Sequence, residues 1–248
     1  MTDVSLQSHQ GRTLREINRR YYDSLWQDTW LVEPQRFNTW PLVQSLVANS
    51  TQRLEVAPGL RPRLPLEGTH FADISSPALR ALAQRKGNAV QAEISALPFR
   101  DGAFDLVCAF DIIEHVEDDT GALTELCRVT APGGTMLLSM PLHASRWTSF
   151  DEFVGHCRRY DPNLLQAMLV NHGLAVRESG AYGMQPQSSK LLDLGIWWMN
   201  ENRERAMWWY NRVFMPLGVL FQKRLKLSPG MIDTRLVDEI VLVCRKTG

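Results

Sequence analysis

Several features that mark specialised proteins are missing from this chain of 248 residues. Lysine plus arginine and aspartate plus glutamate are equal at 27 each, so no basic excess indicates a nucleic-acid partner. No apolar run approaches the roughly 18 residues of a membrane-spanning helix. The N-terminal stretch, MTDVSLQSHQGR, has no apolar core. We therefore expect no signal peptide and a cytoplasmic location.

Cysteine is scarce, and no pair has the C-x-x-C spacing of a zinc or redox site. The four cysteines are scattered at Cys108, Cys127, Cys157 and Cys244. We expect reduced thiols, as is usual in cytoplasmic proteins, and no bound metal.

The composition that is present is that of an ordinary globular domain, with 44% apolar and 22% charged residues. Between Arg53 and Ser139, four short apolar runs alternate with helix-like segments, which predicts a parallel sheet with crossover helices. Acidic residues stand at or close to the expected strand ends: Glu55, Asp73, Glu93 and Asp111. Since ligands of open α/β sheets bind beyond the carboxyl ends of the strands, a ligand with hydroxyls, an amino group and a positive charge is favoured.

Five motifs follow one another in this stretch: LEVAPG, FADIS, an acidic residue before LPF, FDLVCAFDIIEHV, and PGG before a further strand. Their order resembles that of class I S-adenosylmethionine-dependent methyltransferases with a type 11-like domain. The resemblance implies a Rossmann-like α/β fold with a seven-stranded, mostly parallel sheet whose last strand is antiparallel. It also implies S-adenosyl-L-methionine as cofactor and S-adenosyl-L-homocysteine as product.

The chain is expected to have three parts. These are an N-terminal helical cap (1–50), a methyltransferase core (51–186 and 234–248), and a tryptophan-rich helical insertion (187–233) between the last two strands. Apolar periodicity predicts helices over 12–30 and after Asn38. Strands are predicted over 54–57, 69–73, 89–92, 104–110, 135–140, 174–179 and 239–244.

The resemblance assigns a set of residues to the cofactor. Asp73, at the end of the second strand, has two carboxylate oxygens that suit a ribose diol. Glu93 corresponds to the acceptor of the adenine amino group, with Ile94 and Ser95 beside the ring. The other cofactor candidates are Glu55, Ala57, Gly59, Ile74, Phe110 and Asp111. Two alternatives stay open: Asp73 caps the following helix, and Glu93 is a solvated loop carboxylate.

The first loop departs from the family pattern of an acidic residue followed by x-G-x-G-x-G. Only Gly59 remains, with Ala57 and Pro58 where small residues are expected, and Pro58 lacks an N–H donor. Pro62 and Pro65 argue against a long helix, so the first crossover is expected to be short. Such a loop predicts weakened cofactor binding, or its loss.

Catalytic and acceptor-binding candidates follow the fourth and fifth strands. His115, His143 and His156 are candidate bases, because imidazole titrates near neutral pH. The alternative for His115 is a positioning role. Arg158 and Arg159, with Tyr160, are candidates for holding an anionic acceptor group. The alternative is a solvated basic turn.

Aromatic residues at the N-terminus and in the insertion have several interpretations. Tyr22 would contact the cofactor as part of a lid, or would pack on the sheet. The insertion, with Trp208, would cap the acceptor site, form a dimer interface, lie on a membrane surface, or pack on the sheet.

The sequence therefore predicts methyl transfer to the oxygen or nitrogen of a small or amphipathic acceptor. The alternative is a non-catalytic methyltransferase-like module that binds a protein partner through the insertion. A nucleotide-binding oxidoreductase is disfavoured, because its glycine fingerprint is missing. Nucleic acid is not an expected partner, while peripheral membrane contact and a homodimer stay open.

Overall fold

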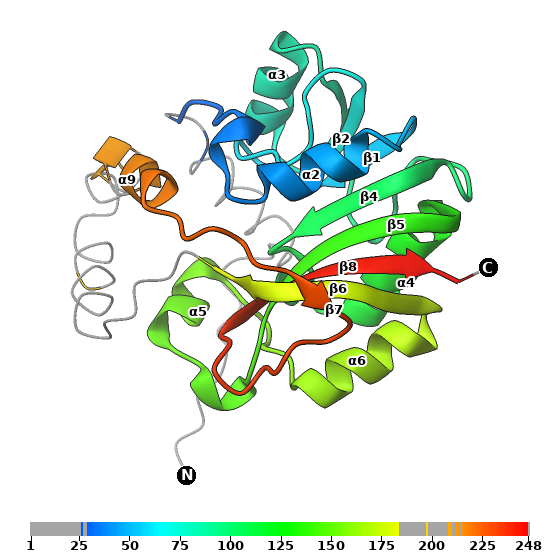
Figure 1. Ribbon diagram of the computed structural model, residues 1–248. Coiled ribbons are helices and arrows are strands. Elements are labelled where there is room, and N and C mark those ends of the chain that lie inside the picture. The colour runs from blue at the N-terminus through cyan, green and yellow to red at the C-terminus, as the bar shows by residue number, and fades with distance from the viewer. Residues whose placement is uncertain are drawn as a thin grey trace, which may run out of the picture.

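One mixed sheet forms the centre of the computed structural model (Figure 1), which describes residues 26, 29–183, 197, 208–209, 212–213 and 215–247. The strand order is β3-β2-β1-β4-β5-β8-β6-β7. The strands are β1 (Arg53–Val56), β2 (Thr69–Asp73), β3 (Asn88–Gln91), β4 (Phe104–Phe110), β5 (Thr130–Pro141), β6 (Leu174–Tyr182), β7 (Ser228–Pro229) and β8 (Glu239–Lys246).

Strands β1 to β5 run parallel, and β8 lies antiparallel between β5 and β6. The predicted fold is thus confirmed, with one strand more than expected. The additional strand is β7, two residues that pair with β6 inside the predicted insertion. Strand order reverses between β1 and β4, which is where open α/β sheets bind their ligands.

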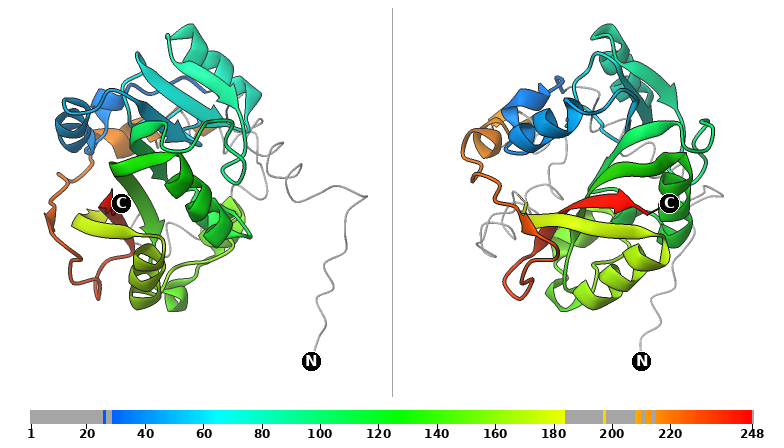
Figure 2. Two further views of the ribbon diagram at one scale, coloured as in Figure 1. Left: turned by 90° about the vertical axis from the view of Figure 1, so that its right-hand side faces the viewer. Right: turned by 45° about the vertical axis from the view of Figure 1, so that its right-hand side comes forward.

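Helices cover both faces of the sheet (Figure 2). The described helices are η1 (Pro34–Arg36), α2 (Trp40–Val47), α3 (Ser76–Gln84), η2 (Ile113–His115), α4 (Asp119–Val129), η3 (Ala144–Arg146), α5 (Ser149–Val154), α6 (Pro162–Asn171) and α9 (Met215–Leu220). α2 is the helix predicted after Asn38, with Pro41 in its first turn.

The central strand β4 is apolar on both sides because both sides are covered. Leu106 and Cys108 pack in a cluster with Val43 of α2. Val107 and Ala109 point into the larger cluster, which includes side chains of α4 and α6. This arrangement explains why β4 reads as a continuous apolar run rather than an alternating one.

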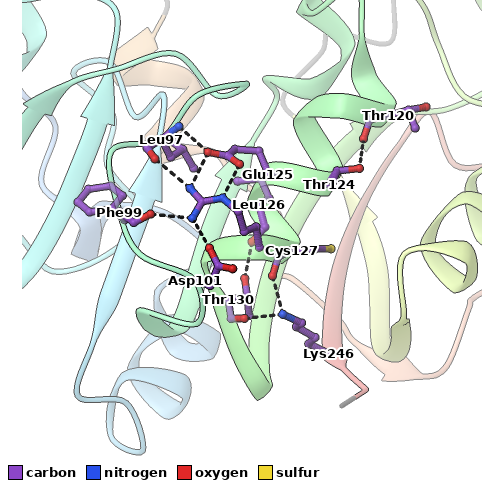
Figure 3. Close-up of polar contacts among 11 residues, drawn as sticks. Leu97, Phe99, Asp101, Thr120, Thr124, Glu125, Leu126, Cys127, Thr130 and Lys246 are labelled. Atoms are coloured by element: carbon purple, nitrogen blue, oxygen red, sulfur yellow. Dashed lines mark hydrogen bonds and ion pairs between the residues drawn. The ribbon is translucent and has the colours of Figure 1, made fainter.

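Arg128, at the end of α4, holds the loop between β3 and β4. Its guanidinium donates to the carbonyls of Leu97 (3.0 Å) and Phe99 (2.7 Å), and to carboxylates of Asp101 (2.7 Å) and Glu125 (2.7 and 2.8 Å). Figure 3 shows these acceptors converging on one side chain. The loop that carries the adenine candidates is therefore fastened to a core helix.

Parts of the prediction lie outside the described residues. These parts include most of the helix over 12–30, with Tyr22, and most of the insertion. The described end of the insertion contacts the N-terminal part: Asn38 N–H donates to Gln222 (2.8 Å), and the Asn38 side chain donates to the Lys223 carbonyl (2.8 Å). No helix in the described ranges has the length and apolar character needed to cross a membrane.

Candidate active site

The loop between β1 and β2 is short and contains no helix, as its prolines predict. Glu55 closes it: its carboxylate is buried and accepts N–H bonds from Arg63 (2.8 and 3.0 Å) and Leu64 (2.8 Å). Burial raises the pKa of Glu55 to about 7, against the backbone hydrogen bonds and the charge of Arg63, which lower it. In this structure, Glu55 stabilises the loop through these backbone hydrogen bonds.

At the start of this loop, Ala57 (φ 55°) and Gly59 (φ 53°) have left-handed backbone conformations. At Gly59 a side chain is also excluded by space, since a Cβ would overlap the ring of Trp26. Ala57 pays the conformational cost that glycine would avoid. Its position matches a glycine of the family pattern, so the loop keeps the backbone path although the residue differs.

Asp73 ends β2 and is nearly buried. One carboxylate oxygen accepts from Gly59 N–H (2.9 Å) and the other from Ser75 N–H (2.8 Å). The side chain therefore connects the first loop to the start of α3. Each oxygen has more than one acceptor position, so these bonds are compatible with the ribose contact, which stays a prediction.

The adenine candidates differ in exposure. Ile94 is buried, Glu93 and Ile74 are half-buried, and Ser95 is exposed. Leu97, two residues beyond Ser95, donates its N–H to Glu125 of α4 (2.7 Å). The segment is thus fixed by α4 while part of its side chains faces outward.

Arg63 is a functional candidate that the sequence prediction missed. The side chain is buried, lies over the ring of Phe37 (3.7 Å) and donates to the hydroxyl of Tyr182 (2.8 Å). Its Nε and Nη1 are buried without a hydrogen-bond partner among the described residues. Burial disfavours its charge, but Tyr182, Asp111 and Glu55 outweigh this effect and raise its pKa. A buried guanidinium with unused donors is suited to bind an anionic group.

Asp111 follows β4 in a left-handed conformation (φ 50°), unusual for a residue with a side chain. Ser139 of β5 fixes it by accepting its N–H (2.9 Å) and donating to its carboxylate (2.5 Å). Burial and then the charge of Asp111 raise the pKa of both Glu114 and Glu239. Three carboxyl groups therefore meet here, an environment that favours a cation. The preceding residue, Phe110, is buried and packs edge-on against Tyr182.

Two of the three candidate histidines lie together. The rings of His115 and His156 are 4.6 Å apart between centroids. Burial, and then the neighbouring His156, lower the pKa of His115 to about 3, so its imidazole is neutral near pH 7. His143 does not belong to this pair. Its Nε2 lies 2.8 Å from the carbonyl oxygen of Thr234.

The acceptor-binding candidates are engaged with protein groups. Arg159 is buried and donates to Asp151 (2.8 Å), whereas Arg158 pairs with Asp119 (2.6 Å). The Tyr160 hydroxyl also donates to Asp119 (3.1 Å). Trp208 is 52% exposed. The two arginines therefore stabilise the segment after β5, and an acceptor role for them stays a prediction.

Comparison with known proteins agrees with this architecture. Residues 63–138 match the methyltransferase domain family. Demethylmenaquinone methyltransferase of Mycobacterium bovis is 37% identical over 86 residues, which are 34% of this chain and 37% of that protein. The match thus spans little more than a third of that relative's length.

Two solved structures show the same fold along most of the chain. The cyclase SpnF has a TM-score of 0.59 at 16% identity, covering 95% of this chain and 96% of its own. The other is a phosphoethanolamine N-methyltransferase of Haemonchus contortus in complex with phosphomonomethylethanolamine and S-adenosylhomocysteine. Its TM-score is 0.56 at 14% identity, and the match covers 96% of this chain and 61% of that protein.

The strand order defines a Rossmann-like fold, in which the acidic strand ends lie near the switch point where such sheets bind ligands. The match to the methyltransferase domain over residues 63–138 supports the predicted resemblance to class I S-adenosylmethionine-dependent methyltransferases. The resemblance predicted from the order of the motifs is confirmed by this match.

Proposed function

We propose that this protein binds S-adenosyl-L-methionine beyond the carboxyl ends of β1, β2 and β4 and directs methyl transfer to a small or amphipathic acceptor. When bound, the cofactor supplies a methyl group on a positively charged sulfur. The observation that carries the proposal is the buried guanidinium of Arg63 near the half-buried carboxylate of Asp111 at the switch point. Arg63 has two unused donors, and Asp111 is close enough to raise its pKa.

The residues present fit the functional groups of the cofactor. Arg63 would hold the carboxylate of its methionine part and Asp111 the ammonium. Asp73 would accept from the ribose hydroxyls. Glu93, Ile94 and Ser95 would receive the adenine. Ala57 and Gly59 allow the close approach of backbone that the ligand needs, while Glu55 keeps this loop in place.

The contribution of the chain to the reaction is alignment and exclusion of water, since the cofactor is intrinsically reactive. The carboxyl groups of Asp111, Glu114 and Glu239 favour a positively charged ligand. A base role for His115, His143 or His156 stays a prediction that depends on whether the acceptor carries a proton.

The acceptor is proposed from two lines of support. A relative named demethylmenaquinone methyltransferase shares part of the chain, which favours an amphipathic acceptor. Trp208 and Trp209 are both exposed in the insertion and would offer an apolar cover. Oxygen or nitrogen methylation, peripheral membrane contact, a homodimer and a cytoplasmic location stay predictions.

The alternative is a methyltransferase-like module without turnover that binds a protein partner. The structurally similar SpnF is named a cyclase, so the fold alone does not determine methyl transfer. The two hypotheses are distinguished by turnover: the methyltransferase binds the cofactor and transfers its methyl group, whereas the module does not.

Calorimetric titration with S-adenosylmethionine and S-adenosylhomocysteine tests the proposal, after copurified ligand has been removed. Asp73→Ala should weaken binding by about 1–3 kcal/mol, because ribose hydroxyls lose their buried acceptor. Asp105→Ala is the matched control. Asp105 also accepts backbone N–H bonds, from Thr51 (2.9 Å) and Gln52 (3.1 Å), but at the opposite, amino end of the strands. Equal affinity in Asp73→Ala and wild type would contradict the assignment.

A second variant tests the charge pair. Arg63→Met should weaken S-adenosylhomocysteine binding by roughly 10- to 100-fold, the value of a charge-assisted hydrogen bond. It should leave 5′-methylthioadenosine binding nearly unchanged, because that ligand lacks the amino-acid part. An equal loss for both ligands would mean that Arg63 only supports the loop.

A further inference from the structure

Three side chains with metal-ligating atoms meet beyond the ends of β4 and β5. Glu114 and His115 belong to η2, which follows β4, and His156 follows α5. One ligating atom of each lies within 4.8 Å of the other two. Zinc binds such atoms at about 2 Å, so small side-chain rotations would bring all three around one ion.

Both histidines have an oxygen partner at Nδ1. His156 Nδ1 lies 2.8 Å from Asp151 Oδ1, and His115 Nδ1 lies 3.2 Å from the carbonyl oxygen of Gly155. These oxygens only accept, so each Nδ1 carries the proton and Nε2 is left as the lone-pair atom. Metal-ligating histidines are held in this way by a carboxylate or a backbone carbonyl.

Glu114 supplies an independent observation. Its side chain is 1% exposed, and Oε2 is buried without a hydrogen-bond partner among the described residues. The other oxygen, Oε1, lies 3.8 Å from His156 Nε2, too far for a hydrogen bond. A buried carboxylate with an unused oxygen is costly unless a cation completes its surroundings.

The supporting residues are themselves fixed. Asp151 is buried and accepts from Arg159 (2.8 Å) and from both the N–H and the hydroxyl of Thr148 (2.8 Å each). The N–H of Cys157 donates to the carbonyl of Glu114 (2.7 Å), which joins the two segments directly. Hydrogen bonds thus connect the segments that carry the three candidate ligands.

We propose that Glu114, His115 and His156 bind one divalent first-row transition-metal ion. Two imidazoles and one carboxylate suit Zn²⁺, Mn²⁺, Fe²⁺ or Co²⁺, whereas Mg²⁺ and Ca²⁺ prefer all-oxygen surroundings. Three protein ligands leave coordination positions for water or a substrate atom, as in catalytic metal sites.

In this arrangement, His115 and His156 are ligands rather than bases. An acceptor hydroxyl bound at an open position would lose its proton to water more readily, because coordination lowers the pKa of bound oxygen. That role rests on the proposed methyl transfer, whereas binding of the ion does not.

The test uses the full-length, tag-free protein after treatment with a chelator. Calorimetric titration with Zn²⁺ should give one ion per chain. Titration with Co²⁺ should give the visible absorption bands of a nitrogen- and oxygen-ligated ion. Neither readout involves S-adenosylmethionine, so failure of this proposal is distinct from failure of the methyltransferase proposal.

Two variants test proposed ligands, and a third tests the carboxylate that orients His156. His156→Gln and Glu114→Gln keep the approximate side-chain size and should lower Zn²⁺ affinity by more than about 100-fold, whereas Asp151→Asn should lower it by about 10- to 100-fold. His172→Gln is the matched control. His172 is half-buried at the end of α6 and bonds to Thr124 and to the carbonyl of Met168, outside the cluster.

A wild-type protein that takes up no stoichiometric Zn²⁺ or Co²⁺ would overturn the proposal. So would Zn²⁺ affinity that is the same in the Glu114 and His156 variants as in wild type. Circular dichroism establishes that each variant is folded. If one variant fails to fold, the wild-type stoichiometry and the remaining variant still decide the outcome.

Discussion

At the scale of single residues, Glu55 couples stability to pH. Its pKa is raised by burial from 4.5 to about 7 in the folded protein. Between these values the folded protein holds a proton that the unfolded chain releases, so the free energy of unfolding falls as pH rises. This contribution is fully present below pH 4.5 and is lost as pH rises through about 7. It amounts to about 3 kcal/mol.

Urea unfolding at several pH values between 4.5 and 7.5 measures this slope. Glu55→Gln should reduce it, because glutamine fills the same space without titrating. Glu67→Gln is the control, since Glu67 is exposed in the same loop. A slope that is identical in Glu55→Gln and wild type would show that Glu55 is ionised in the folded protein throughout this range.

Asp73 shows that two interpretations of one residue are compatible, and its ligand contact stays a prediction. The sequence left open whether it binds ligand or caps α3. Its bond to Ser75 N–H belongs to the start of α3, and its bond to Gly59 N–H belongs to the ligand loop. A carboxylate has enough acceptor positions for both and for a diol.

At the scale of elements, α4 stabilises the adenine-side loop through Arg128. Arg128→Ala removes five hydrogen bonds to Leu97, Phe99, Asp101 and Glu125. Because the side chain is partly exposed, we expect a loss of only about 1–2 kcal/mol in the free energy of unfolding. We also expect weaker S-adenosylhomocysteine binding, since the loop carries Glu93, Ile94 and Ser95.

Arg235→Ala serves as the comparison for this variant. Arg235 pairs with Asp233, but both side chains are largely exposed. Its removal should leave urea unfolding and ligand binding unchanged. If Arg128→Ala behaves like Arg235→Ala in both measurements, the loop is held by its apolar contacts alone.

At the scale of the whole molecule, cofactor binding should raise thermal stability. A ligand that binds only the folded state at 100 times its Kd adds about 2.7 kcal/mol. For a chain of this size, that corresponds to roughly 5–10 °C in Tm. Differential scanning fluorimetry with S-adenosylhomocysteine measures the shift, and Asp73→Ala should reduce it. No shift in ligand-free wild type would favour the non-catalytic module.

Much of the fold was predictable because its signals are local. The bounds of β2 and β4 match the predicted ranges, since each strand is an apolar run with a turn or an acidic residue at its end. The short first crossover followed from its prolines, because proline restricts the backbone by itself. The acidic residues near the strand ends were expected at one edge of the sheet, because the carboxyl ends of parallel strands lie at the same edge.

The sequence by itself therefore determined the architecture and the resemblance to methyltransferases, and it predicted the edge of the sheet at which we propose the site. Only the tertiary structure decided which side chains meet there. From the sequence, Arg63 is only a residue of a loop; its contacts with Phe37 and Tyr182 appear in the tertiary structure. Glu114 and His156 belong to segments far apart in the chain, so no spacing rule links them. Such contacts arise from the packing of distant segments, which local patterns do not encode.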